Sequence, residues 1–274
     1  MAFSQTPGPT STIPAGTRER ASDLLKASLK DKNPDTRKHG VQALSLVTAS
    51  DFWLSQTEMM LDDKDVQVRV AAITSLVDLK GGSTIPSLRK ALNSDVPEVS
   101  FAAAKALWVL HDPEGRDALI SVVDGETKAQ SGYFTTKKRE ALRMFHTPRT
   151  LFVFALVTGA GFAPVPGLGS GLSSLQGILS DPTVSGRAAA ALLLSNEETP
   201  EVLEALRHAL GDSNWSVRAA AVHVIALRNN PALQSVLIPL LDDKRDAVRV
   251  RAAAAFVRLD ELSSGANRLS TRKN

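Results

Sequence analysis

The chain contains a five-position pattern that returns about every 31 residues. A leucine is followed two residues later by Asp, and the Asp is followed six residues later by Arg. A small residue comes three residues after the Arg, and an apolar residue comes seven after it. In six copies, the Asp-equivalent positions are 32, 31, 87, 31 and 31 residues apart. A period of this length is typical of repeat architectures, in which each repeat is one supersecondary unit.

Each copy reads as two antiparallel helices joined by a tight turn. Leucines one helical turn apart precede the Asp, as at Leu206 and Leu210, and a Pro or Asn after the Asp ends the first helix. The second helix is rich in Ala and aliphatic residues. One pair cannot cover its own apolar faces, so neighbouring pairs must stack. With an irregular seventh copy beginning near Val122, the sequence predicts an all-α chain, an α-solenoid (superhelix) of about seven antiparallel helix pairs.

The Asp and Arg positions are expected to form a polar ladder along the turns. A carboxylate ahead of the second helix can accept backbone N–H groups, and the Arg can pair with its own or a neighbouring repeat's Asp. This turn ladder consists of Asp31, Arg37, Asp63, Arg69, Asp181, Arg187, Asp212, Arg218, Asp243 and Arg249. The third copy has Ser94 and Ser100 at these two positions, so an interruption of the ladder is expected there.

These helix pairs, with an Asp in the turn and an Arg in the second helix, resemble the HEAT repeat family over residues 22–262. The short repeats are most similar to the bacterial subgroup that also includes phycobilin lyases. The resemblance implies an α-solenoid. It implies no single chemistry, because the family includes scaffolds, lyases, a hydroxylase and DNA glycosylases.

The repeat positions also predict how the chain is divided. Residues 1–19 are expected to form a flexible N-terminal segment, because their Ser, Thr and Pro content is typical of linkers. The solenoid is expected over residues 20–262, with insertions near 125–132 and 157–171, and residues 263–274 form a polar C-terminal tail. No signal peptide is recognisable in 1–19, so a cytoplasmic location is the default, with export implied if a signal peptide is missing from this chain.

Several kinds of chemistry are not supported by the sequence. The absence of Cys excludes disulfides, a Cys-ligated metal site and a thiol nucleophile. None of the five His is followed by Glu, as the iron-binding His-Glu dipeptides of HEAT-like hydroxylases require, and we predict no catalytic, cofactor or metal site. A net charge of +3, from 32 basic and 29 acidic residues, argues against nucleic acid as the partner. The predicted function is a non-catalytic scaffold that binds another protein.

Residues that break the repeat are the best candidates for partner binding, since solenoid insertions often map to a binding face. Residues 150–180 carry no charge, and a basic cluster precedes them. The candidates are Arg139, Arg143, Arg149, Phe162, Pro164, Pro166 and Leu168. Two alternatives stay open: a lyase- or hydroxylase-like HEAT enzyme, and a membrane-surface adaptor that uses the apolar insertion 151–172. The segment 151–157 also fits a buried first helix of the next repeat.

Overall fold

The computed structural model describes residues 13–79, 84–124 and 185–271. Its N-terminal part holds seven α-helices and one short 3-10 helix. They are α1 (Thr17–Leu29), α2 (Pro34–Leu44), α3 (Asp51–Met59), η1 (Met60–Asp62), α4 (Val66–Asp78), α5 (Thr84–Leu92), α6 (Pro97–Val109) and α7 (Pro113–Asp124). Helices α1 and α2, α3 and α4, and α5 and α6 form three of the predicted pairs.

The C-terminal part begins with the second helix of a repeat and adds two complete pairs. Its elements are α11 (Gly186–Leu193), η4 (Leu194–Asn196), α12 (Pro200–Ala209), α13 (Trp215–Leu227), η5 (Pro231–Asp242) and α14 (Asp246–Thr271). All the helices and 3-10 helices of the described ranges follow the predicted alternation, and the all-α solenoid is confirmed. The first helix of the last pair, η5, is a 3-10 helix, and it contains Pro239, which cannot donate an α-helical hydrogen bond.

The turns between paired helices end on polar N-caps. The side chains of Asn33, Asp65 and Asn214 accept backbone N–H groups at the starts of α2, α4 and α13. These side chains satisfy N–H groups that have no partner inside the helix. Each cap lies two residues after a ladder Asp, so the repeated turn sequence itself fixes where each second helix begins.

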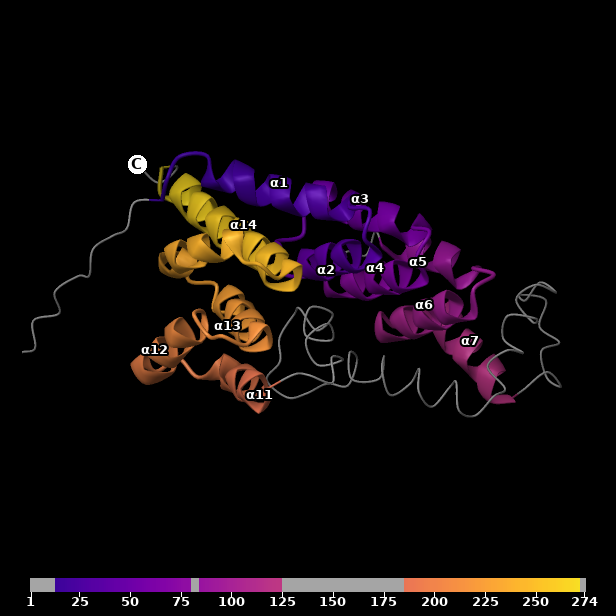
Figure 1. Cartoon of the computed structure of the whole chain (residues 1–274). Helices are drawn as coiled ribbons and strands as arrows, with labels where there is room; N and C mark the ends of the chain where they lie inside the picture. The colour runs from indigo at the N-terminus through magenta and orange to yellow at the C-terminus, as the bar shows by residue number, and fades with distance from the viewer. Residues whose placement is uncertain (1–12, 80–83, 125–184, 272–274) are drawn as a thin grey trace, which may run out of the picture.

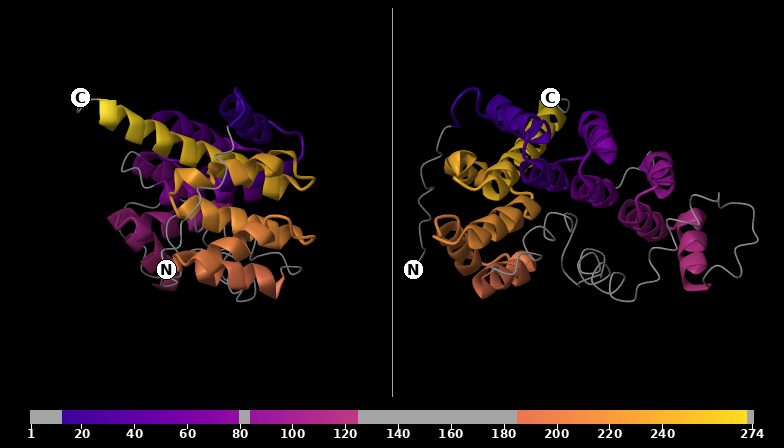
Figure 2. Two further views of the ribbon diagram at one scale, coloured as in Figure 1. Left: turned by 90° about the vertical axis from the view of Figure 1, so that its left-hand side faces the viewer. Right: turned by 45° about the vertical axis from the view of Figure 1, so that its right-hand side comes forward.

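The helix pairs form a two-layered arch (Figure 1). The second helices of the pairs, α13, α14, α2, α4 and α6, lie along the inner side of the arch, and the first helices lie along its outer side (Figure 2). We call the surface of the second helices that points away from the first helices the inner face.

The order of the repeats along the arch differs from their order in the chain, because the last repeat stacks on the first. Helix α14 packs against both α1 and α2. Near the starts of the helices, the Thr36 hydroxyl donates to the Asp246 carboxylate at 2.7 Å, and Arg258, in the middle of α14, donates to the Leu46 carbonyl just after the end of α2 at 3.0 Å. Helices α14 and α2 are therefore parallel, as consecutive second helices of a solenoid are.

The apolar core is continuous through this junction. One buried cluster includes Leu25 and Leu44 of the first repeat together with Ile225 and Phe256 of the last two. A second cluster covers α5, α6 and α7, and α4 contributes to both. Because the last repeat covers the first, neither of these two repeats is an exposed end of the stack.

Some predicted boundaries can be compared with the helices. Helix α1 begins at Thr17, inside the segment 1–19, and α14 continues through residues 263–271 of the polar tail. The insertions near 125–132 and 157–171 lie outside the described residues. In the part of the chain that is described, no helix has the length and apolar character needed to cross a bilayer.

Candidate partner-binding surface

Arg37 shows how the turn ladder connects consecutive repeats. Its Nε and Nη2 donate to the two carboxylate oxygens of Asp63, in the next repeat, at 2.7 and 2.8 Å. Its Nη1 donates to the Asp31 carbonyl of its own repeat at 2.9 Å. The guanidinium therefore fixes one turn against the next through a bidentate, charge-assisted contact.

The same geometry recurs at Arg218. Its Nε and Nη2 donate to Asp243 at 2.7 and 2.9 Å, and its Nη1 donates to the Asp212 carbonyl at 2.7 Å. Arg187 also makes two contacts with Asp212. Arg249, at the junction with the first repeat, instead donates to Asp246 and to the Asp243 carbonyl.

The ladder carboxylates also hold their own turns. Asp31, Asp63 and Asp212 each accept the backbone N–H two residues ahead at 2.8 Å. The hydrogen bond from Arg37 is the main reason that the pKa of the Asp63 carboxyl is lowered, and the same hydrogen bond raises the pKa of Arg37. The Asp is thus both a turn residue and the acceptor for the preceding repeat.

The third repeat departs from the ladder. Ser94 keeps the turn function, because its hydroxyl accepts the Val96 N–H at 3.2 Å. The Ser100 hydroxyl donates to the Leu92 carbonyl at 2.8 Å. Arg69, which precedes Ser94 by 25 residues, makes no ion pair within the described residues.

The partner-binding candidates that break the repeat cannot be placed. They lie outside the described residues, as do the ladder residue Asp181 and the apolar insertion 151–172. The seven candidates are Arg139, Arg143, Arg149, Phe162, Pro164, Pro166 and Leu168. The candidate surface within the described residues is therefore formed by the repeats themselves.

The inner face has a fixed sequence register. Eleven residues after the six turn positions come Gln42, Thr74, Lys105, Leu192, His223 and Ala254. Gln42, Thr74 and His223 are buried, whereas Lys105, nearer one end of the arch, is only partly buried. Burial lowers the pKa of the Lys105 ammonium to about 8, so this lysine is still largely a cation at neutral pH.

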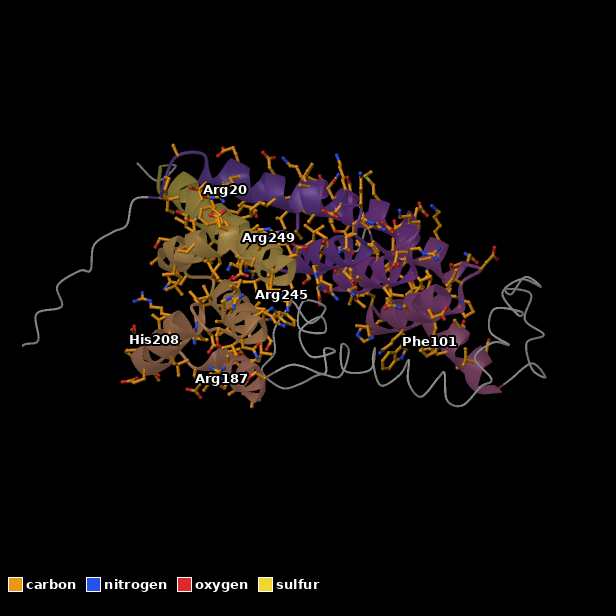
Figure 3. All side chains as sticks on the ribbon, in the orientation of Figure 1. Arg20, Phe101, Arg187, His208, Arg245 and Arg249 are labelled. Atoms are coloured by element: carbon orange, nitrogen blue, oxygen red, sulfur yellow. The ribbon has the colours of Figure 1, made fainter. Side chains whose placement is uncertain are left out.

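Helix α6 presents two aromatic residues on either side of that lysine. Phe101, Lys105 and Trp108 are spaced at i, i+4 and i+7, which places them on one face of the helix. Trp108 is 52% exposed, and Phe101 points toward the inside of the arch (Figure 3). We call these three residues the α6 patch. The sequence analysis did not identify the α6 patch. Its three residues lie seven, eleven and fourteen residues after Ser94, so the repeat pattern could have located them.

A second polar group lies deeper on the inner face. Arg251 of α14 is buried and donates to the Ala247 carbonyl at 2.6 Å. Burial, and then the charge of Arg251, lower the pKa of His39 to about 4 and of His223 to about 3. Both imidazoles are therefore neutral at pH 7. Among the described residues, no three His, Cys, Asp or Glu side chains are grouped so that they could hold a metal ion.

A comparison with protein families agrees with the fold. A family model described as HEAT repeats matches residues 56–130 and 173–257, together more than half of the chain. No curated protein matches the chain in sequence. Solved structures that match include human deoxyhypusine hydroxylase in complex with glycerol. It is 15% identical, with 89% of this chain and 97% of that chain covered, at a TM-score of 0.33.

Proposed function

Because the chain belongs to the HEAT repeat family, we propose that it is a non-catalytic scaffold that binds another protein along the inner face of its arch. The observation that carries this proposal is the α6 patch. The ladder and the small, regular core account for the stability of the repeats, whereas an exposed Trp108 contributes little to folding. Trp108 shares one face of α6 with Phe101, and apolar groups gathered on one exposed face are the kind of surface that a partner covers.

The chemistry of the α6 patch fits a protein surface. Trp is among the residues most enriched at the energetic centres of protein interfaces, since it buries a large area and loses little conformational entropy. Truncating the side chain of a residue at such an energetic centre to Ala costs at least about 2 kcal/mol of binding energy in typical interfaces, or about 30-fold in affinity.

Site-specific photo-crosslinking in the organism of origin tests the proposal. A photoreactive phenylalanine analogue replaces Trp108 in the full chain, and the matched control carries it at the exposed Phe52 on outer helix α3. A discrete protein adduct is expected at position 108 and not at 52. Trp108→Ala is then expected to weaken binding of the captured protein by at least tenfold without lowering the melting temperature.

Two results would contradict the scaffold. Adducts that form equally at positions 52 and 108 would show that the α6 patch is not a specific contact. A stoichiometric metal in the purified full chain, lost together with a catalysed reaction on chelation, would instead favour the enzyme alternative.

A further inference from the structure

The interruption of the turn ladder leaves a cation where each comparable repeat has an ion pair. Arg37, Arg187 and Arg218 each contact the carboxylate that follows 25 or 26 residues later. Arg69 occupies the Arg position of the second repeat, but the residue 25 positions later is Ser94. A serine hydroxyl cannot supply the second oxygen and the negative charge that these arginines bind.

The turn of the third repeat keeps its own hydrogen bonds despite the two serines. Ser94 still accepts the backbone N–H of Val96, as Asp63 accepts that of Asp65. Ser100, at the ladder Arg position of this repeat, is satisfied by the Leu92 carbonyl. The turn therefore stays in place, while Arg69 has neither the carboxylate of the next repeat nor the own-turn carbonyl bond that Arg37 and Arg218 make.

Arg69 is half-buried, and its Nε is buried without a hydrogen-bond partner. A buried donor without an acceptor costs free energy unless a ligand supplies the acceptor. The nearest acidic residues in the sequence of the facing turn, Asp95 and Glu98, form no ion pair with Arg69 in the described ranges. Asp63 is already occupied by Arg37, and Asp65 caps the start of α4.

We propose that Arg69 and the turn at Ser94 form a receptor for one acidic side chain of the partner protein. The incoming Asp or Glu carboxylate takes the position that Asp63 and Asp243 hold in the intact ladder steps, and it accepts two hydrogen bonds from the guanidinium. This inference rests on the proposed scaffold function, and it adds a preference for an acidic residue in the bound segment. The α6 patch belongs to the same repeat as this turn, since Phe101 follows Ser94 by seven residues.

The chain itself offers a variant that fills the gap. Ser94→Asp supplies the missing carboxylate in cis, with the same spacing as the natural pairs. Ser213→Asp is the matched control, since Ser213 is an exposed residue in another ladder turn and the charge change is the same. Ser94→Asp is expected to raise the melting temperature, and Ser213→Asp is expected to leave it unchanged.

The closing experiment selects peptides from a random phage-displayed library on the intact wild-type chain. The selected peptides are expected to share an acidic residue at one position. They should bind Ser94→Asp and Arg69→Gln at least tenfold more weakly than wild type, and Ser213→Asp equally well. In the wild type, the Nε–H NMR resonance of Arg69 should shift on peptide binding.

The outcomes separate the two proposals. Peptides that bind wild type and Ser94→Asp equally, or that share no acidic position, would overturn the receptor and leave the scaffold function standing. The receptor also fails if Ser94→Asp gives no gain in melting temperature, because the carboxylate at 94 then does not reach Arg69. A library that yields no peptide above background on any variant contradicts the scaffold function itself.

Discussion

Asp63 shows how much one ladder residue contributes at the residue scale. The side chains of Arg37 and Asp63 are only 6% and 10% exposed, so their ion pair is largely removed from water. Removing one partner of such a pair leaves the other charge buried without compensation. The contribution of the pair is therefore best measured as the cost of breaking it.

We expect Asp63→Asn to lower the free energy of unfolding by about 3 kcal/mol, because Arg37 loses its counter-charge. The neighbouring Asp62→Asn is the control, since Asp62 pairs with Lys90 in an exposed bridge that is worth at most about 1 kcal/mol. Urea unfolding of the three proteins measures both values. Equal effects at positions 62 and 63 would contradict the assigned role of the ladder.

The same pair predicts a pH dependence. Because the pKa of Asp63 is lowered in the fold, its stabilisation is complete above the unfolded pKa of about 3.9 and is lost as the pH falls through the folded value. The stability difference between wild type and Asp63→Asn should be constant from pH 7 to 5 and should shrink below pH 4. The buried His39 and His223 also destabilise the fold in acid, but both proteins carry them, so their contribution cancels.

At the scale of helices, the close approach of helices from neighbouring repeats depends on residues with little or no side chain. A Cβ atom added at Gly115 would lie 2.3 Å from the Trp108 nitrogen and 2.7 Å from the Ala104 carbonyl oxygen. Both are backbone atoms of α6, so α7 can accommodate a larger residue only by moving away from α6.

Gly115→Ala should therefore destabilise the protein by about 1–3 kcal/mol, although Ala is the better helix former. Gly265→Ala, in α14, has no atom within 4 Å of the new Cβ and should stabilise the protein by up to about 1 kcal/mol. Thermal unfolding of the two variants gives opposite shifts in melting temperature if the packing of α6 and α7 is as described. A gain in stability at position 115 would contradict it.

The paired helices were predictable from sequence because two local signals agree. The apolar spacing marks the helices, and the Asp with the Pro, Asn or Asp that follows marks the turn, as at Asp31 and Pro34. The 3-10 geometry of η5 was not predicted, although Pro239 lies inside it and disrupts α-helical hydrogen bonding. The α6 patch could not be predicted in the same way, because Phe101, Lys105 and Trp108 occupy ordinary positions of the repeat and no local signal sets them apart.

At the scale of the whole molecule, the order of stacking could not be read from the sequence. Every pair presents similar Ala-rich and aliphatic faces, so the repeat pattern alone does not state which two pairs meet when the chain returns. The junction depends on residues outside the repeat signature, such as Arg18 with Asp260 and Thr36 with Asp246. These contacts place the N-terminal repeat in the middle of the arch, between α14 and α4.

This stacking makes the two ends of the chain depend on each other. The outer helix α1 contacts α14, and Arg20 pairs with Asp242 across the junction, with both side chains exposed. Since the chain has no Cys, a pair of introduced thiols is the only one that a crosslinker can join.

The most direct measurement is intramolecular crosslinking of the full chain that carries Arg20→Cys and Asp242→Cys, with a short bismaleimide at low protein concentration. The control combines Arg20→Cys with Lys90→Cys, an exposed position on α5. We predict a crosslinked monomer for the first pair and none for the second, detected by mass spectrometry. Absence of the product in the first pair, or equal yields in both, would contradict the stacking of the last repeat on the first.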